Sequence, residues 1–220
     1  MSGTKESAKN RKERLANILT ALRRKYPEAP LALHFGNGFE LLVAVILSAQ
    51  CTDERVNRVT AELFKKYRSA QDYLNAPREQ LEEEIKPTGF FRNKAKSLQG
   101  CCRMLVNEYK GEVPKDIDRL VKLPGVGRKT AAMVLGNAYG LQEGIAVDTH
   151  VSRVVQRVQL ASATTPDKIE QELMKMVPRD QWTWFSNASI LHGRETCTAK
   201  KPKCGICPIE KWCLFPDKNL

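Results

Sequence analysis

Apolar residues recur at intervals of three and four along most of the chain, and no segment alternates as a half-buried strand does. Clear examples of this spacing are Val56, Val59, Leu63 and Phe64; Leu98, Leu105, Val106 and Tyr109; Val151, Val154, Val155 and Val158; and Ile169, Leu173, Met176 and Val177. Helix punctuation agrees, because Pro166 suits a first helical position and Gly111 and Gly140 follow periodic runs. We therefore expect an all-α protein.

The composition is that of a folded, basic protein. A hydrophobic share of 42% in 220 residues supports one large or two small domains, and 36 lysines and arginines against 25 acids give a net charge of +11. This charge favours a polyanionic partner such as nucleic acid. The polar, basic start predicts no signal peptide, and the longest apolar stretch, 41–47, is far shorter than the roughly 20 residues of a membrane span. We expect an intracellular protein with reduced cysteines.

The stretch LPGVGRKTA, which begins at Leu123, places two cations directly after a two-glycine turn and before an apolar, helical run. Acids are favoured in the first turn of a helix, so Arg128 and Lys129 indicate that an anion binds nearby. A nucleotide phosphate loop is excluded, because Leu123 and Arg128 stand where its two glycines should be. We interpret the stretch as a helical hairpin in which backbone N–H groups around Gly125 and Gly127 hold one phosphate of a polymer backbone.

A cysteine quartet lies near the C-terminus, in the stretch CTAKKPKCGICPIEKWC. Its members are Cys197, Cys204, Cys207 and Cys213. Tetrahedral zinc and a cubane iron–sulfur cluster both accept four cysteines, so the spacing predicts a metal centre without choosing the metal. The other three cysteines have no partner at ligand spacing and are expected in the core: Cys51, Cys101 and Cys102.

Four motifs occur in order over nearly the whole chain: LSAQCTD at 47–53, LPGVGRKTA at 123–131, VDTHVSRV at 147–154 and LHGRETCTAKKPKCGICPIEKWC at 191–213. Together they resemble the endonuclease III family of DNA glycosylases. The resemblance implies two α-helical domains with a DNA-binding cleft between them. A six-helix domain with the helix-hairpin-helix motif would span 31–140, and an iron–sulfur domain would join 1–30 to 141–220. The cysteine quartet would hold a [4Fe–4S] cluster.

The same resemblance assigns catalytic roles to Lys129 and Asp148, which would face each other across the cleft. The neutral amine of Lys129 would attack the sugar C1′ and displace the base, and the resulting imine would permit β-elimination of the 3′ phosphate. We expect the helix N-terminus, Arg128 and partial desolvation to disfavour the ammonium form. Asp148 is also a good N-cap for a helix that opens there.

Further DNA contacts are implied by the resemblance. Gln50 would fill the gap left by the flipped nucleotide, and either Phe90 or Phe91, in TGFFRNKA, would wedge into the base stack. Arg194 and the lysines among the cysteines would contact phosphates, as would the hairpin residues Leu123, Gly125, Gly127 and Arg128.

We therefore expect a monomeric, bifunctional DNA glycosylase and AP lyase of base excision repair. Its substrate would be double-stranded DNA that contains oxidised pyrimidines or abasic sites, and its location the prokaryotic cytoplasm, at the nucleoid and away from membranes. Two alternatives stay open at this point. One is a helix-hairpin-helix glycosylase of different base specificity, although an adenine glycosylase is disfavoured because that relative lacks the hairpin lysine. The other is a non-catalytic DNA-binding protein with a structural metal.

Overall fold

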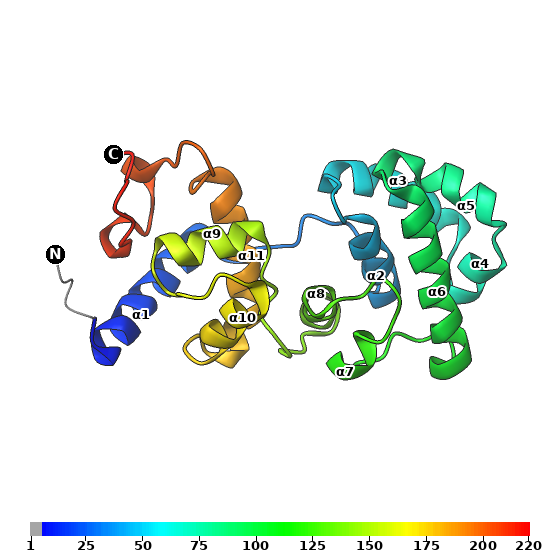
Figure 1. Ribbon diagram of the computed structural model, residues 1–220, viewed down its shortest axis with the longest axis horizontal. Coiled ribbons are helices and arrows are strands. Elements are labelled where there is room, and N and C mark those ends of the chain that lie inside the picture. Colours follow the sequence, from blue (N-terminus) through cyan, green and yellow to red (C-terminus); the bar gives the residue numbers. More distant parts are fainter. Residues whose placement is uncertain (1–5) are drawn as a thin grey trace. The chain divides into compact units, whose positions relative to one another are not determined.

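The computed structural model describes residues 6–220, and the regular elements in this range are all helices (Figure 1). No strand occurs among these residues, which confirms the all-α prediction. The chain divides into two compact units, of which one combines the residues up to Pro30 with Gly144–Leu220 and the other is Leu31–Glu143. No helix among the described residues is long and apolar enough to cross a membrane.

The unit Leu31–Glu143 is built around a buried helix. Its elements are α2 (Gly38–Leu47), α3 (Asp53–Lys66), α4 (Ala70–Asn75), α5 (Arg78–Ile85), the 3₁₀ helix η1 (Lys86–Thr88), α6 (Phe91–Tyr109), α7 (Ile117–Leu120) and α8 (Arg128–Tyr139). Helix α2 packs against α8, α3 and α6, and every side chain from Leu41 to Leu47 is buried. A helix that is apolar on all sides belongs in a core. The longest apolar stretch of the sequence is therefore this core helix.

The isolated cysteines of this unit differ in their surroundings. Cys101 and Cys102, on α6, are buried, and burial raises the pKa of the Cys101 thiol to about 12. Both are small core residues, as predicted. Cys51 is instead partly exposed in the turn between α2 and α3, because the buried apolar run ends at Leu47. The prediction of a core position was wrong for Cys51.

The second unit carries the cysteine quartet. Its elements are α1 (Ala8–Lys25), α9 (Thr149–Arg157), α10 (Pro166–Met174), η2 (Arg179–Gln181), α11 (Trp182–Glu195), η3 (Cys204–Ile206) and η4 (Glu210–Trp212). Helices α9 and α11 pack so closely that a Cβ atom on Gly193 would lie only 2.9 Å from Cβ of His150. The Trp184 indole donates to the Tyr26 carbonyl at 2.8 Å and ties α11 to the end of α1. The core of this unit thus joins the start of the chain to its last third.

Local signals in the sequence account for several helix ends. Pro166 opens α10, and Gly140 ends α8 in the left-handed conformation with φ 68°. Helix α6 ends less simply, because Lys110 takes the left-handed C-cap position with φ 57° and Gly111 follows with φ 83°. The glycine therefore stands one residue later than a glycine C-cap would.

Candidate functional site

The hairpin of the LPGVGRKTA motif joins α7 to α8. Leu123 and Val126 are buried, and the Val126 N–H donates to the Leu123 carbonyl at 3.1 Å, which closes the turn. Gly125 has φ 80°, and a Cβ atom there would lie 2.8 Å from Cβ of Ser97 on α6. Only glycine fits this position without strain, because it combines a left-handed backbone with a close neighbour. The apolar residues thus anchor the turn and leave Gly127 exposed at the start of α8.

Lys129 lies in the first turn of α8 and is exposed. The N-cap residue Gly127 offers no side chain to cap the helix, and no acidic residue lies in the first turn. This helix start is therefore suited to an anion that the protein does not itself supply. Because Lys129 is exposed, the desolvation that we expected for its amine does not come from the protein alone.

Asp148 is the N-cap of α9. Its Oδ1 accepts a hydrogen bond from the Val151 N–H at 2.8 Å, and the residue is partly buried. The N-cap prediction is confirmed. The cap uses Oδ1, so the structural role leaves Oδ2 for a second, chemical one.

Gln50 and Phe90 share an uncommon backbone conformation. Gln50 has φ 52° and Phe90 has φ 49°, in the left-handed region that non-glycine residues seldom adopt. Both are exposed, and the Phe90 side chain is 62% exposed. Phe91, in contrast, is the first residue of α6 and is partly buried. Such strained residues persist only where the surrounding structure holds them in place, and they are concentrated at functional positions.

A buried lysine supports the turn that carries Phe90, and the sequence analysis missed it. Lys94, on α6, is 5% exposed and its Nζ donates to the Thr88 carbonyl at 2.7 Å. Burial lowers the pKa of Lys94. The Thr88 carbonyl directly precedes Gly89 and Phe90, so this bond fixes the start of the exposed turn. The available signal was a lysine one helical turn after Phe90, on the apolar face of α6.

The four cysteines of the quartet line one pocket of the second unit, together with apolar residues such as Ile209 and Phe215. All four are partly exposed. Burial raises the pKa of the Cys207 thiol to about 11, so a bound cation is needed to hold this group as a thiolate at neutral pH. Four soft sulfur donors around one pocket fit a thiolate-bound metal centre.

A site of four cysteines can hold either a single zinc ion or an iron–sulfur cluster. A tetrahedral zinc site requires its sulfur atoms within about 2.3 Å of one centre. A cubane of four irons places each cysteine on a different iron and accepts a wider ring of sulfurs. Four cysteines around one pocket therefore fit a [4Fe–4S] cluster as they would fit zinc.

Two arginines of α9 hold the first cysteine loop, and the sequence analysis missed both. Arg153 Nε donates to the Cys197 carbonyl at 3.0 Å, and Arg157 Nη1 lies 3.3 Å from Cys197 Sγ. Arg157 also donates to the carbonyls of Thr198 and Ala199 at 2.7 and 2.8 Å. Their spacing of four residues on a helix was the signal, since it places both on one face.

The cations of the cysteine segment lie on the surface. Those that are exposed are Arg194, Lys200, Lys201 and Lys203. Their exposure is compatible with the predicted phosphate contacts, and it does not by itself assign them to DNA.

The chain is similar to proteins of base excision DNA repair. Residues 43–179 match the model of the HhH-GPD superfamily base excision DNA repair proteins, and residues 197–213 match the iron–sulfur binding domain of endonuclease III. Endonuclease III of Synechocystis sp. is 48% identical over 97% of this chain and 97% of its own length. Endonuclease III of Escherichia coli (strain K12) is 43% identical over 95% of this chain and 98% of its own length.

Solved structures agree with these relatives. A trapped endonuclease III–DNA covalent intermediate is 45% identical, covers 92% of this chain and 95% of its own, and superposes with a TM-score of 0.88. A thermostable thymine-DNA glycosylase is 27% identical, covers 95% and 98% of the two chains, and superposes with a TM-score of 0.80. The cofactor of the cysteine segment is accordingly a [4Fe–4S] cluster. This chain belongs to the HhH-GPD superfamily of base excision DNA repair proteins and, within it, to the endonuclease III family.

Proposed function

We propose that this enzyme removes oxidised pyrimidines from double-stranded DNA and then cleaves the strand on the 3′ side of the abasic site. As a member of the endonuclease III family, the chain is a DNA glycosylase and AP lyase. The observation that carries the proposal is the hairpin, in which Lys129 follows an uncapped helix start that suits a phosphate.

Lys129 is the proposed nucleophile. Its neutral amine attacks C1′ of the flipped nucleotide, the C1′–N bond to the base breaks, and the base leaves with that electron pair and takes up a proton. Loss of the sugar ring oxygen from C1′ then gives an imine between Lys129 and the opened sugar. The imine acidifies the C2′ proton, and its removal expels the 3′ phosphate by β-elimination. Lys129 is exposed in the free protein, so its side chain is accessible to the sugar of bound DNA.

Asp148 is the proposed carboxylate partner in this reaction. Its N-cap bond to the Val151 N–H holds the carboxylate at the start of α9. A carboxylate can accept the proton of the attacking amine and stabilise positive charge on the sugar as the base leaves. We assign both the capping and the catalytic role to Asp148.

The two left-handed turns are the proposed DNA-reading elements. The more exposed and strained of the two phenylalanines is Phe90, and we assign the wedge to it in preference to Phe91. Gln50 is assigned to the gap opposite the flipped nucleotide. The hairpin residues Leu123, Gly125, Gly127 and Arg128 position one phosphate, and Arg194 contacts another.

Cys197, Cys204, Cys207 and Cys213 are the proposed ligands of the [4Fe–4S] cluster. When bound, the cluster supplies four strong metal–thiolate bonds that order a segment with little regular structure. The polypeptide of this segment then presents its cations at fixed positions. The domain assignment follows, with an iron–sulfur domain that contains α1 and a hairpin domain that contains α2 to α8. We place the enzyme, as a monomer, at the nucleoid of a bacterial cytoplasm, because its relatives are bacterial.

Borohydride trapping tests this proposal. Reduction turns an imine into a stable protein–DNA bond, so native enzyme on a duplex with one oxidised pyrimidine should form a covalent adduct. Lys129→Ala should form none, while Lys122→Ala, which removes an exposed lysine before the hairpin turn, should still be trapped. Peptide mapping of the native adduct should locate the bond at Lys129. An adduct at another residue, or no adduct on either the lesion duplex or an abasic duplex with cluster-loaded enzyme, would refute the mechanism.

A further inference from the structure

The fourth cysteine of the quartet lies in a segment with little regular secondary structure of its own. Cys213 follows the three-residue helix η4 and is itself extended, with φ −83° and ψ 128°. Its Sγ lies 3.8 Å from the Arg157 carbonyl. A single-turn 3₁₀ helix is a weak element, so other parts of the chain must determine where Cys213 stands.

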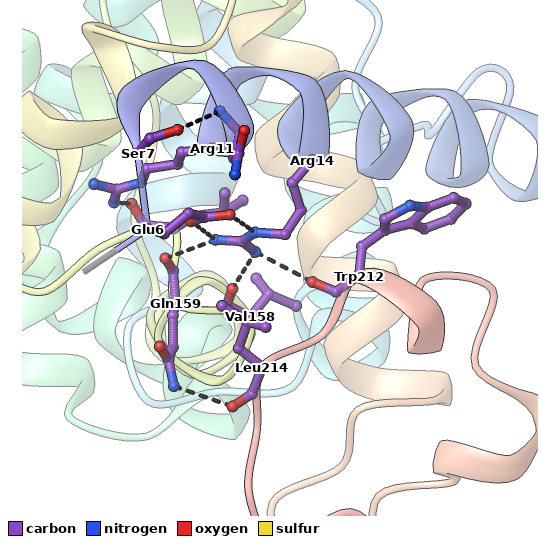
Figure 2. Close-up of polar contacts among 10 residues, drawn as sticks. Glu6, Ser7, Arg11, Arg14, Val158, Gln159, Trp212 and Leu214 are labelled. Atoms are coloured by element: carbon purple, nitrogen blue, oxygen red, sulfur yellow. Dashed lines mark hydrogen bonds and ion pairs between the residues drawn. The ribbon is translucent and has the colours of Figure 1, made fainter. Parts of the chain in front are cut away.

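Arg14, on α1, reaches the peptide just before this cysteine. Figure 2 shows its guanidinium among the backbone carbonyls that follow α9 and the carbonyl of Trp212. Arg14 Nη1 donates to the Val158 carbonyl at 2.6 Å and to the Trp212 carbonyl at 3.2 Å. Its Nη2 donates to the Gln159 carbonyl at 3.3 Å. Trp212 directly precedes Cys213, although it lies 198 residues from Arg14.

The donors of Arg14 are fully used. Nε and Nη2 donate to the two carboxylate oxygens of Glu6 at 2.8 and 2.9 Å, so that all five N–H groups have acceptors. The residue is 8% exposed, and Glu6 supplies the charge that a buried cation requires. The carbonyls after a helix C-terminus lack intrahelical partners and attract a cation, which explains why the guanidinium settles there. Lysine could not reproduce this fork.

Gln159 holds the peptide on the other side of the same cysteine. Its Nε2 donates to the Leu214 carbonyl at 3.0 Å, directly after Cys213 (Figure 2). Gln159 has φ 55°, a left-handed conformation that is costly for glutamine, and its own carbonyl accepts from Arg14. Arg14 therefore acts on Cys213 twice, through Trp212 directly and through the orientation of Gln159.

We propose that Arg14 is a positioning residue for the fourth cluster ligand, so that the N-terminal helix is part of the structure that retains the iron–sulfur cluster. The proposal rests on the assignment of Cys213 as a ligand and is independent of Lys129 and of DNA cleavage. It concerns no catalytic step. Its consequence is that a substitution that weakens the contacts of α1 should release Cys213 from the cluster before the other three cysteines.

Cluster release and cysteine labelling test this proposal. Cluster-loaded native enzyme, Arg14→Met, Arg14→Lys and the control Lys12→Met, an exposed site on the same helix, are exposed to an iron chelator while the visible absorbance of the cluster is followed. Arg14→Met removes, among its five hydrogen bonds, the one to the Trp212 carbonyl next to Cys213, and this loss should accelerate release about tenfold. Arg14→Lys should be intermediate and Lys12→Met like the native enzyme. Circular dichroism verifies that the helices persist.

The order in which the four cysteines become accessible distinguishes a positioning role of Arg14 from general destabilisation. Iodoacetamide is added during release, and the alkylated cysteines are identified by peptide mass spectrometry. In Arg14→Met we expect Cys213 to be labelled before the other three cysteines, and in the native enzyme we expect no such lead. Even labelling of the four cysteines, or a release rate equal to that of Lys12→Met, would overturn the proposal.

A second variant keeps the test decisive if Arg14→Met does not fold. Gln159 is exposed, so Gln159→Ala should leave the core intact while it frees the Leu214 carbonyl. It should give the same early labelling of Cys213. Where both single variants fold, the double variant should release iron little faster than Arg14→Met, because both changes loosen the same cysteine. Labelling of Gln159→Ala in the native order, or multiplicative effects in the double variant, would contradict the proposed coupling.

Discussion

Arg157 Nη1 lies 3.3 Å from Sγ of Cys197, so the last turn of α9 contacts the first cysteine of the quartet directly. The same helix begins at the N-cap Asp148. Nine helical residues span about 13 Å. One short, rigid element therefore links the proposed catalytic carboxylate to the segment that binds the cluster, within a single unit of the fold.

Substitution of Arg157 should weaken cluster retention. Arg157→Leu removes a donor to a cysteine sulfur and leaves the carbonyls of Thr198 and Ala199 without their partner. We expect chelator-induced iron release to accelerate about tenfold, because a hydrogen bond to a charged group is worth about 1.5 kcal/mol or more. The visible absorbance of the cluster reports the rate. Arg157→Lys keeps the charge and loses the planar guanidinium, so its release rate should lie between those of the native enzyme and Arg157→Leu. An unchanged release rate in Arg157→Leu would contradict this role.

Two substitutions of Asp148 should separate its capping role from its proposed catalytic role. Asparagine is as good an N-cap as aspartate, so Asp148→Asn should leave thermal stability nearly unchanged while it lowers the rate of base excision at least about a hundredfold. Asp148→Ala should lose the same activity and also about 1 kcal/mol of stability. Single-turnover kinetics and thermal unfolding measure the two effects. An active Asp148→Asn enzyme would leave only the capping role.

Alanine substitutions of Phe90 and of Phe91 should have different effects on DNA affinity. Phe90→Ala removes an exposed side chain and should lower affinity for a lesion duplex at least about tenfold, since it deletes the wedge while the core is untouched. Phe91→Ala removes a partly buried side chain and should reduce stability more than affinity. Fluorescence of 2-aminopurine next to the lesion reports unstacking. A larger loss of unstacking in Phe91→Ala would reverse the assignment.

The two hairpin glycines should respond differently to alanine. Gly125→Ala forces a side chain into a left-handed backbone and to within 2.8 Å of Ser97 Cβ, so we expect a loss of about 2 kcal/mol in the free energy of unfolding. Gly127 has φ −90° and no atom within 4 Å of a built Cβ, so Gly127→Ala should cost well under 1 kcal/mol. Urea denaturation of the two variants measures the difference. Equal losses would show that the close approach to Ser97 does not constrain the turn.

Acid should remove one stabilising contact of the cluster-bearing unit. The Ser162 N–H donates to Glu172 at 2.7 Å, and its hydroxyl donates at 2.9 Å, which holds the pKa of Glu172 below its usual value. A lowered carboxylate pKa contributes stability that is complete above the usual pKa and is lost as the pH falls through the lowered one. We expect Glu172→Gln to be less stable by about 1 kcal/mol or less at pH 7, because the carboxylate is largely solvated. The difference in Tm should shrink as the pH falls below the usual glutamate pKa and through the lowered pKa of Glu172, and a difference that does not change with pH would exclude an ionic origin.

The sequence by itself determined the class of fold and the family, and it supplied the proposed site residues. Helical periodicity, the hairpin glycines and the cysteine spacing are local patterns, and local patterns survive without knowledge of long-range contacts. They sufficed for the helices α3 and α9, for the N-cap Asp148 and for the iron–sulfur segment. The four motifs at 47–53, 123–131, 147–154 and 191–213, taken in order, sufficed for the family.

The tertiary structure decided the residues that support those patterns. Arg14 and Arg157 have partners that lie far away along the chain, so the sequence does not show what they bind. The position of Lys94 on an apolar face hinted at burial, but only the structure shows that it donates to the Thr88 carbonyl. The structure also distinguished Phe90 from Phe91 and put Cys51 in an exposed turn, since exposure depends on where neighbouring helices end. A side chain that donates to a backbone carbonyl leaves no mark on that carbonyl's residue type, so no sequence pattern pairs Arg14 with Trp212.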